Sequence, residues 1–364
     1  MINGTLRVGL VGPLPPPFGG MANQTRQLAE LLSGQGITVS LVQVNPPYRP
    51  NWIGQVPILR ALSRLLPYIV SLWRQAGQSD VVHIMANSGW SWYLFAAPAI
   101  WIAHRRKVPV VINYRGGEAE KFLNKSANKI RWSLSQASVL AVPSGFLQEV
   151  FGRFGINATV VPNIVNLERF HNPTPHRGRR RHLLVARNLE PIYDNETAIR
   201  AFALVHASYP DATLTIAGSG PEASALQTLA NDLSLSTAVK FTGRLEPQVM
   251  ADLYREVDVA INPSLVDNMP NSVLEALASG IPVVSTNVGG VPYVVTDSVT
   301  ALLVPASSPE AMAAALMRLL DKPDLCDRLI ENGLAEIQRY TWDTVWPMWE
   351  KVYQSALSEK TKLV

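Results

Sequence analysis

The stretch VDVAINPSLVDNMPNSVLEALASGIPVVS, residues 257–285, holds two apolar runs with a helical pattern between them. The runs Val257–Ile261 and Pro282–Ser285 are apolar almost throughout, which is typical of parallel strands buried on both faces of a sheet. Between them, a helix is predicted to begin near Pro270, a favoured first-turn residue, and to end at Gly280, a favoured C-terminal cap. A strand, a helix and a further strand in this order are the repeating unit of a doubly wound α/β sheet.

The same alternation continues along the whole chain of 364 residues. Because a single sheet of twelve strands would be unusual, two sheets of about six strands each are expected. The segment 171–181 is predicted to be a linker, since it holds two prolines, one glycine and four arginines. The expected fold is therefore α/β, with two doubly wound, Rossmann-like domains at 1–170 and 182–341. The candidate strands are Leu6–Val11, Thr38–Val44, Val81–Met85, Val108–Asn113, Val139–Val142, Thr159–Val161, His182–Ala186, Thr213–Ala217, Val239–Thr242, Val257–Ile261, Pro282–Ser285 and Ala301–Val304.

Charge is unevenly distributed between the two halves. Residues 1–170 hold 16 of the 32 Lys and Arg residues but 6 of the 28 Asp and Glu residues, so their net charge is +10, against +4 for the whole chain. This asymmetry indicates an anionic partner for the first half, and without a nucleic-acid motif a membrane surface or a phosphorylated acceptor fits better than nucleic acid. The single cysteine, Cys326, excludes a disulfide framework and fits a reducing, cytoplasmic compartment.

One segment of the first half raises the question of a transmembrane helix. From Val81 to His104 there is no Asp, Glu, Lys or Arg. The turn signal Asn87–Gly89 divides this segment into a short strand and an apolar helix, Trp90–Ala103, of about the length of a core helix. A buried helix is therefore expected.

A second segment bears on a membrane surface. The helical pattern Val56–Gln75 combines a wide apolar face with a polar stripe that includes Arg60, Arg64, Ser71 and Gln75. Two interpretations remain open: a core-facing helix interrupted by its proline, or peripheral contact with an anionic membrane through 46–75.

The helix predicted after Pro270 has an apolar side of Val273, Leu274, Ala276 and Leu277, and a side of short polar residues at Asn271, Ser272, Glu275 and Ser279. It follows a strand's carboxyl end, where open α/β sheets bind ligands, and its N-terminus suits a diphosphate. Glu275 could then accept hydrogen bonds from both hydroxyls of a ribose. The alternative is a solvent-facing glutamate on an amphipathic helix.

A glycine-rich turn, Gly218–Ala223, follows the predicted strand Thr213–Ala217 and matches the pattern of dinucleotide-binding sites. A nicotinamide enzyme should also carry an acid at the end of the next strand, but Val239–Thr242 is followed by Gly243 and Arg244. A tight strand-to-helix turn is therefore the preferred interpretation, and a nicotinamide oxidoreductase is the least favoured function.

Seven short motifs lie along the chain in a particular order: Gly19-Gly20 after the first strand, Pro143-Ser144, 161–170, 186–190, 217–222, 241–243 and 267–275. Each motif is weak alone. In this order they resemble the family-4 glycosyltransferases, which are retaining enzymes of the two-domain GT-B fold, and the resemblance covers nearly the whole chain.

The resemblance implies two Rossmann-like domains facing across a cleft, and transfer of a sugar from a nucleoside-diphosphate sugar to an acceptor with retention. A donor phosphate oxygen takes the acceptor proton in this mechanism, so no catalytic carboxylate pair is required. Arginines with a helix end could stabilise the leaving diphosphate without a metal, and no cofactor is expected. The acceptor implied is a lipid-linked molecule or a glycan of cell-surface polysaccharide or glycolipid assembly, at the inner face of the membrane.

The resemblance also implies roles for individual residues. Gly19 and Gly20 would let backbone N–H groups approach the diphosphate, and Arg187 would bind the same phosphates from the second domain. Glu275 would bind the ribose, and a terminal helix at 342–358 would cross back onto the first domain. The other implied donor contacts are Asp267, Asn268, Met269, Pro270, Asn271 and Ser272 for the sugar, Arg244 and Leu245 near the base, and Gly116 in the first domain.

Three positions depart from the family pattern. Asp267 stands where the family usually has Glu, so the carboxylate is one methylene shorter. The family's second cation, a Lys, falls at about Tyr193 in a phosphate loop that continues through Asp194 and Asn195. Arg115 stands where the family often has His. We expect Arg115 to replace the missing lysine as a phosphate cation.

Two further functions remain open. A GT-B-fold sugar-nucleotide epimerase would share the nucleotide contacts but release a monosaccharide without an acceptor. A non-catalytic subunit of a polysaccharide assembly complex would fit the three departures, although Arg187 and Glu275 are intact.

Overall fold

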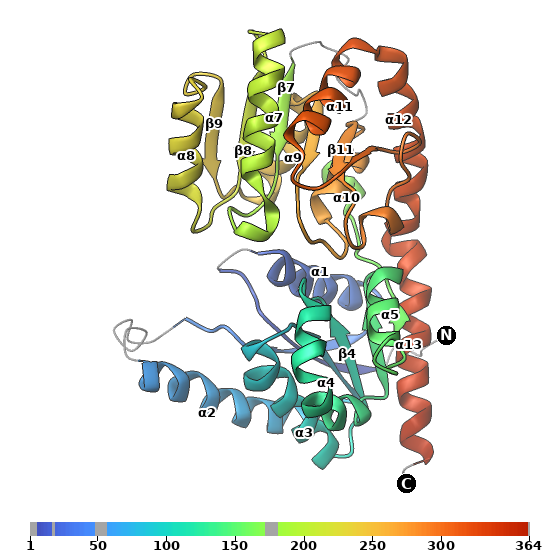
Figure 1. Ribbon diagram of the computed structural model, residues 1–364. Helices are drawn as coiled ribbons and strands as arrows, with labels where there is room; N and C mark the ends of the chain where they lie inside the picture. The colour runs from blue at the N-terminus through green and yellow to red at the C-terminus, as the bar shows by residue number, and fades with distance from the viewer. Residues whose placement is uncertain (1–5, 17–18, 48–56, 172–180, 363–364) are drawn as a thin grey trace. The chain divides into compact units, whose positions relative to one another are not determined.

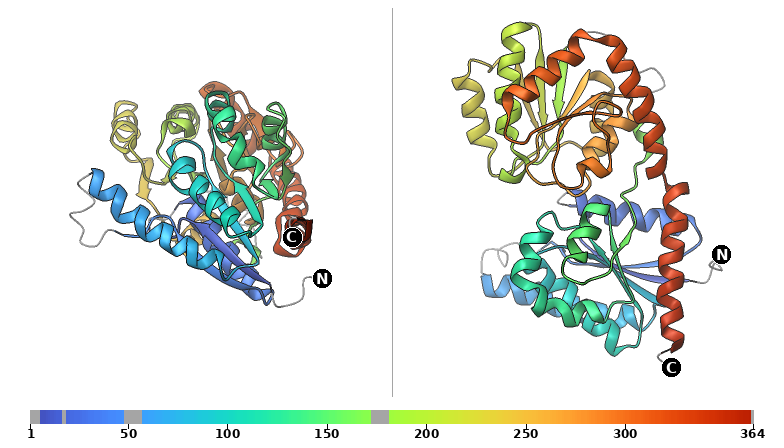
Figure 2. Two further views of the ribbon diagram at one scale, coloured as in Figure 1. Left: turned by 90° about the horizontal axis from the view of Figure 1, so that it is seen from below. Right: turned by 45° about the vertical axis from the view of Figure 1, so that its right-hand side comes forward.

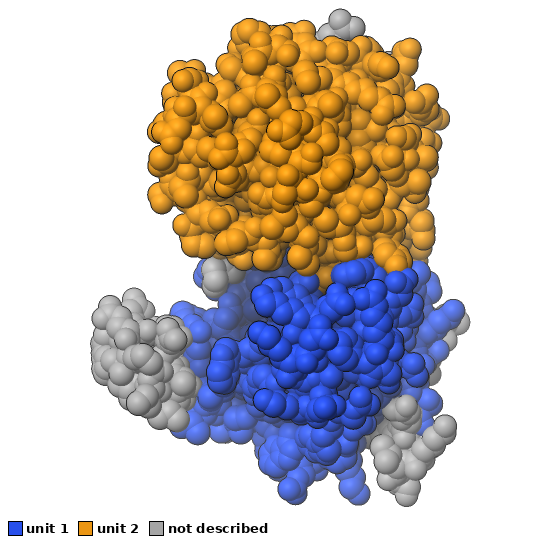
Figure 3. All heavy atoms as spheres, in the orientation of Figure 1, with its two compact units in different colours: residues 1–163, 345–364 blue, residues 164–344 orange. Residues whose placement is uncertain are grey.

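The computed structural model describes residues 6–16, 19–47, 57–171 and 181–362. The chain divides into two compact units (Figure 3): unit 1 comprises 1–163 and 345–364, and unit 2 comprises 164–344. Residues 172–180 of the predicted linker lie outside the described residues.

The division falls before the predicted linker, after Asn163. Val165 and Phe170 are buried in the core of unit 2, and the Val165 N–H donates to the carbonyl of Tyr340. The short helix α6 (Leu167–Phe170) therefore belongs to unit 2.

Unit 1 contains a parallel sheet of six strands in the order β2-β1-β3-β4-β5-β6 (Figure 1). Its strands are β1 (Arg7–Gly12), β2 (Thr38–Gln43), β3 (Val81–Ala86), β4 (Val110–Tyr114), β5 (Val139–Val142) and β6 (Thr159–Val160). Its helices are α1 (Gly20–Gly34), α2 (Pro57–Ala76), the π-helix η2 (Trp92–Ala96), α3 (Ala97–Arg105), α4 (Ala119–Ser135) and α5 (Gly145–Gly152), with the later part of α13 (Trp342–Lys362).

Unit 2 repeats this plan with the strand order β12-β11-β10-β7-β8-β9. Its strands are β7 (His182–Val185), β8 (Thr213–Ala217), β9 (Val239–Gly243), β10 (Val259–Asn262), β11 (Val283–Thr286) and β12 (Leu302–Val304). Its further helices are η3 (Pro191–Tyr193), α7 (Asn195–Ser208), α8 (Ala223–Asp232), α9 (Pro247–Glu256), α10 (Asn271–Ala278), η4 (Val291–Tyr293), α11 (Pro309–Asp321), α12 (Pro323–Glu336) and η5 (Ile337–Tyr340). The predicted fold class and all twelve predicted strands are confirmed, with strand ends that differ by at most two residues.

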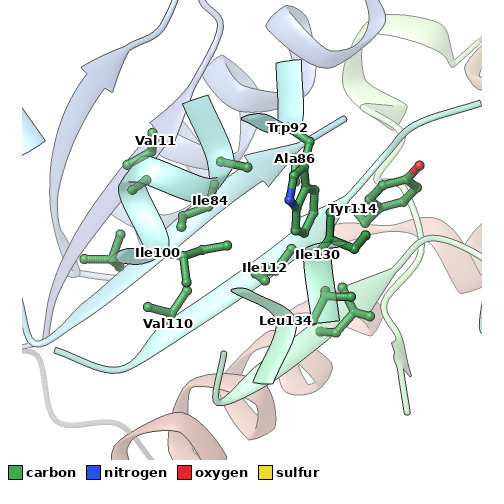
Figure 4. Packing of buried hydrophobic residues seen from close by; sticks show 14 of the residues in the cluster. Val11, Ile84, Ala86, Trp92, Ile100, Val110, Ile112, Tyr114, Ile130 and Leu134 are labelled. Carbon is green, nitrogen blue, oxygen red and sulfur yellow. The ribbon is translucent and has the colours of Figure 1, made fainter. Parts of the chain in front are cut away.

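The core of unit 1 shows why its strands are continuously apolar. Both β3 and β4 are buried along their whole length because helices cover both faces of the sheet. Trp92, Ile100 and Tyr114 are among its largest fully buried side chains (Figure 4). The apolar segment 90–105 is thus helical and packs one side on the sheet, with a π-helical turn at η2. The prediction of a buried helix holds for that side only, since Trp90 and Trp101 are 78% and 44% exposed. No helix in the described ranges is both long and apolar enough to span a bilayer.

Helix α13 returns the end of the chain to unit 1, where it runs beside the sheet (Figure 2). Trp349 and Tyr353 are fully buried there, and the ring centroids of Trp349 and His83 on β3 are 4.8 Å apart. His83 Nδ1 lies 2.8 Å from the Tyr353 hydroxyl. The terminal helix therefore packs on unit 1 through Trp349 and Tyr353.

Candidate active site

The neighbouring strands β7 and β10 bring Arg187 and Asp267 together at their carboxyl ends. Arg187 follows β7, and Asp267 lies in the loop between β10 and α10. Arg187 Nη2 donates to Asp267 Oδ2 at 2.6 Å, and its Nη1 donates to the hydroxyl of Ser272, in the first turn of α10, at 3.4 Å. Both charged side chains are only 10% exposed, so water screens this ion pair weakly.

Tyr193 holds the Arg187 guanidinium from another side. The guanidinium carbon lies 4.0 Å from the centroid of the Tyr193 ring, a stacking distance at which a cation is attracted to the ring face. Arg187 Nε is buried and has no hydrogen-bond partner in the described part of the chain. The Arg187 guanidinium is therefore held in position by Asp267 and Tyr193, while its Nε–H donates no hydrogen bond within the described residues.

The electrostatics of Asp267 follow from this arrangement. Burial raises the pKa of its carboxyl, while Arg187 and the hydroxyl of Ser264 act in the opposite direction. The Asp267 carboxylate lies next to the Arg187 guanidinium. The Arg187 guanidinium is thus already paired with a carboxylate of the protein itself, that of Asp267.

Glu275 lies one turn into α10 and is half-buried, so the solvent-facing alternative does not describe it. Burial raises the pKa of Glu275 to about 7, against the opposing effects of Tyr254, Arg169 and Arg187. The Tyr254 hydroxyl donates to the carbonyl of Ser272 at 3.1 Å and also interacts with the Glu275 carboxyl. A carboxyl with such a perturbed pKa beside a helix N-terminus is a candidate for ligand binding.

Two glycines that sequence reasoning left without a role shape the loop before α10. A Cβ on Gly290 would collide with the backbone carbonyl of Asn268, and one on Gly289 would collide with the carbonyl of Asp267. Gly289 also has a positive φ of 52°, and the Gly290 N–H donates to Asp267 O at 2.8 Å. The glycine pair after β11 therefore allows the loop to lie directly against it.

The glycines of 218–223 serve the loop after β7 in the same way. A Cβ on Gly218 would collide with the carbonyl of Arg187, and one on Gly220 with that of Leu189. The Leu189 N–H donates to Ser219 O at 3.1 Å. These contacts support the tight-turn interpretation, because the backbone approached by the glycines is the protein's own.

The predicted phosphate loop divides into two parts. The Asp194 carboxylate accepts from the N–H of Thr197 at 3.3 Å and from its hydroxyl at 2.7 Å, so it caps α7. Asn195 is fully buried and donates to the carbonyl of Asn188 at 3.0 Å. Among the three predicted residues, Tyr193 is the one that contacts Arg187.

The remaining predicted residues of unit 2 have different surroundings. Asn268 and Met269 are buried in the loop before α10, Pro270 precedes its first residue, and Asn271 is half-buried. Arg244 is exposed and Leu245 half-buried in the loop after β9.

Ser279, which was predicted to share the polar side of the helix, is completely buried at the C-cap of α10. Its N–H donates to the carbonyl of Glu275 at 3.0 Å, so it keeps the helical spacing from that residue.

Unit 1 holds the other predicted donor contacts. Gly19 and Gly20 lie at the N-terminus of α1, where a Cβ would meet no atom within 4 Å. Gly116 has close neighbours, since a Cβ there would lie 2.6 Å from the Tyr114 hydroxyl and 2.7 Å from Asn87 Oδ1.

Arg115 is held by amide side chains of its own unit. Its Nε donates to Asn113 Oδ1 at 2.6 Å, and its Nη1 donates to Asn163 Oδ1. Asn113 Nδ2 in turn lies 3.0 Å from Nε2 of His83, which contacts Tyr353 through its other ring nitrogen. Burial lowers the pKa of Arg115 to about 9. Within the described ranges, no ion pair involves Arg115.

Sequence reasoning missed the residues that support the site. They are Tyr254 beside Glu275, the pair Gly289 and Gly290, and the chain of His83, Asn113, Asn163 and Tyr353 behind Arg115. The two adjacent glycines after a strand carried a usable signal, because they mark a close backbone approach. As for metals, no group of three or more His, Cys, Asp or Glu residues in the described ranges could hold an ion.

Comparison with known proteins identifies the class. The family model described as "Glycosyltransferase Family 4" matches residues 18–169, and that described as "Glycosyl transferases group 1" matches residues 167–335. The two models together span residues 18–335, so the chain belongs to the family-4 glycosyltransferases, and its fold is GT-B.

Its relatives differ in the molecules that their names mention. The chain is 34% identical to a D-inositol 3-phosphate glycosyltransferase of Streptomyces griseus over 187 residues, 48% of this chain and 39% of that protein. It is 29% identical to the glycogen synthase of Mycobacterium tuberculosis over 295 residues, 76% of this chain and 69% of that protein. The match spans only 39–51% of the length of five D-inositol 3-phosphate glycosyltransferases.

Solved structures share the fold over nearly the whole chain. The sucrose-phosphate synthase of Thermosynechococcus elongatus has a TM-score of 0.75 at 20% identity, covering 97% of this chain and 100% of that one. Anabaena HepE in complex with UDP also has a TM-score of 0.75, at 16% identity, covering 96% of this chain and 100% of that one.

Proposed function

We propose that this glycosyltransferase moves a sugar from a nucleoside-diphosphate sugar to an acceptor with retention of configuration. The observation that carries the proposal is the buried Arg187–Asp267 ion pair beside the N-terminus of α10, with the half-buried Glu275 one turn further on. A fixed cation and a helix N-terminus favour a diphosphate, and a carboxylate at that spacing favours the hydroxyls of a ribose.

The proposed mechanism needs no metal ion or cofactor. Arg187 and the helix dipole stabilise the charge that develops on the leaving diphosphate, and a donor phosphate oxygen takes the proton of the acceptor hydroxyl. The protein places the reacting groups and supplies no carboxylate pair for acid and base catalysis. Gly19, Gly20 and Arg115 are the contributions that we assign to unit 1. Full activity in the presence of a metal chelator is the expected result.

The acceptor that we propose is a lipid-linked molecule or a glycan of cell-surface assembly, used at the inner face of the cell membrane. The charge of +10 in residues 1–170 supports an anionic acceptor or surface. The segment 46–75, predicted to contact lipid, lies outside the described residues at 48–56.

The test is a thermal-shift and calorimetric survey of nucleoside diphosphates and their sugars. A ligand at one hundred times its Kd stabilises the folded chain by about 2.7 kcal/mol, which a thermal shift detects easily. Arg187→Ala and Glu275→Ala should each lower donor affinity roughly tenfold to a hundredfold. Arg200→Ala is the matched control, because Arg200 is exposed and paired with Glu196 on α7.

The outcomes separate the competing functions. Donor binding followed by sugar transfer to an added acceptor supports the proposal. Donor turnover to free monosaccharide without an acceptor would assign an epimerase, and no binding of any nucleoside diphosphate would assign a non-catalytic subunit.

A further inference from the structure

Helix α2 of unit 1 has apolar stripes on two different sides. Tyr68, Leu72 and Ala76 face inward and belong to the core of unit 1. A second stripe follows the helical spacing i, i+3, i+4, i+7 on the outside, and its members are 36–64% exposed. A surface helix normally presents polar residues on that side, so packing within the described protein does not account for the second stripe. The outward stripe consists of Leu66, Ile69, Val70 and Trp73.

The apolar surface continues onto the two neighbouring helices, since α3 packs against both α2 and α4 (Figure 1). Trp101 on α3 is 44% exposed and Trp132 on α4 is 53% exposed. The Arg106 guanidinium, just after α3, lies 5.0 Å from the ring centroid of Trp73. The His104 and Trp132 rings are 6.4 Å apart, so side-chain contacts connect α2, α3 and α4.

Cations are interleaved with these aromatic rings. The Arg105 guanidinium lies 5.1 Å from the Trp101 ring centroid, and Arg74, Lys107 and Arg131 are exposed nearby in the sequence. The helices α2, η2 and α3 contain no Asp or Glu. On α4, the Glu120 carboxylate forms an ion pair with Arg153 at 2.9 Å. We call the outward stripe together with Trp101, Arg105, Arg106 and Trp132 the aromatic–cationic surface.

We propose that the aromatic–cationic surface binds an anionic lipid bilayer. Tryptophan rings favour the boundary between headgroups and acyl chains, because the indole is apolar with one polar N–H. Arginine can keep its charge at the headgroups while its stem covers apolar surface, and each cation near an anionic bilayer adds attraction. Stable peripheral binding needs both burial of apolar groups in the bilayer and electrostatic attraction to its headgroups. The three adjacent helices supply apolar and cationic groups for these two contributions.

This surface includes part of the 46–75 segment predicted from the sequence but extends beyond it onto α3 and α4. That prediction assigned Gln75 to the solvated polar stripe of α2, but Gln75 is buried and donates to the carbonyl of Ser40 at 2.6 Å. The proposed lipid-binding side of α2 is instead the outward stripe, and two of the three tryptophans of the aromatic–cationic surface come from α3 and α4. The proposal is independent of the transfer reaction, because none of its residues belongs to the candidate active site.

Flotation of the 364-residue chain with vesicles tests the proposal. The vesicles consist of phosphatidylcholine alone or of equal parts phosphatidylcholine and phosphatidylglycerol, at low and high salt. We expect binding to the anionic vesicles at low salt and weaker binding at high salt. Arg105→Glu with Arg106→Glu should lower partitioning on the order of a hundredfold. The matched control, Arg318→Glu with Arg328→Glu, makes the same change of charge on exposed residues of unit 2 and should bind nearly as the unaltered chain does.

A second set of variants tests the apolar half. Trp73→Ser, Trp101→Ser and Trp132→Ser together should abolish flotation, whereas Leu204→Ser, Val249→Ser and Tyr293→Ser, which are 43–50% exposed in unit 2, should not. If the triple tryptophan variant is unstable, the three single variants replace it, each with a partial loss expected. Unchanged donor binding and thermal unfolding in each variant show that the fold and the active site are intact.

Three results would overturn the proposal. One is no flotation with anionic vesicles at low salt. Another is equal binding to both kinds of vesicle, which would mean apolar adsorption without charge selectivity. The third is self-association of the chain that the tryptophan variants abolish, which would assign the surface to a second copy.

Discussion

At the scale of single residues, the ionisation of Glu275 makes the free energy of unfolding depend on pH. Burial raises the pKa of Glu275 to about 7, above the 4.5 of an unperturbed glutamate. Between these two values the folded chain holds a proton that the unfolded chain has released, so the free energy of unfolding falls as pH rises through this range. The protein thus keeps a partly desolvated carboxyl at some cost in stability, as expected for a binding residue.

Glu275→Gln removes this cost because an amide cannot ionise. The variant should unfold roughly 2–4 °C above the unaltered chain at about pH 8, a shift that corresponds to about 1 kcal/mol after allowance for the partial exposure of the side chain. The difference should shrink as the pH is lowered towards about 5. Thermal melts of both chains across this range measure it, and a difference that does not depend on pH would refute the assignment of the shift to Glu275.

Tyr193 is expected to position Arg187 rather than to bind phosphate itself. Tyr193→Ala should weaken donor binding by about 0.5–2 kcal/mol, or roughly twofold to thirtyfold, because the stacking contact with the guanidinium is lost. Tyr193→Phe keeps the ring and should bind the donor almost normally. Calorimetry distinguishes the two variants, and an equal loss in both would point to the hydroxyl instead.

Arg115 is held by Asn113 and Asn163 and is the candidate phosphate cation of unit 1. Arg115→Ala should lower kcat roughly tenfold to a hundredfold, while donor KM rises less, if its contact serves the transition state more than ground-state binding. Steady-state kinetics with Arg115→Lys as the charge-conserving control provide the measurement. A rise in KM at unchanged kcat would assign Arg115 to ground-state binding.

At the scale of elements, the loop before α10 depends on the glycines that follow β11. Gly290→Ala would place a methyl group against the carbonyl of Asn268, so it should cost about 2 kcal/mol or more in the free energy of unfolding. Gly152→Ala in α5 is the control, since its Cβ meets no atom within 4 Å, and it should be neutral or slightly stabilising. Denaturant unfolding compares the two. Equal stabilities would mean that the loop and the glycine pair can move apart freely.

The sequence predicts the elements well because parallel strands buried on both faces are continuously apolar. The boundaries of α10 follow from Pro270 and Gly280, which favour particular positions at the two ends of a helix. Gln75 was misplaced because periodicity reports polarity and not which buried carbonyl needs a donor. The Arg187–Asp267 pair joins residues 80 positions apart, so its contact could not be read from local spacing, although both residues lie in recognisable motifs.

At the scale of the whole molecule, the two units differ in whether they are formed by one segment of the chain or by two. Unit 2 is one continuous segment, 164–344, whereas unit 1 is completed by 345–364. We expect a fragment of residues 164–344 to fold alone, because both of its core clusters lie within it. A fragment of residues 1–163 leaves His83 without Trp349 and Tyr353 and should need the peptide 345–364 to reach its full stability. Circular dichroism melts of the two fragments, with and without the peptide, test both expectations, and a peptide without effect on the first segment would refute the second.

The return of α13 to unit 1 also determines the order in which the two units can complete their folding during synthesis. Domains usually complete their folding in the order in which they leave the ribosome. Here unit 1 must wait for residues 345–364, which follow unit 2 along the chain, while unit 2 can already close its core. Termination before Val345 therefore gives a chain in which unit 2 is complete, whereas unit 1 lacks the residues that contact His83. Such a chain exposes the surface of β3 around His83 that α13 covers in the full chain.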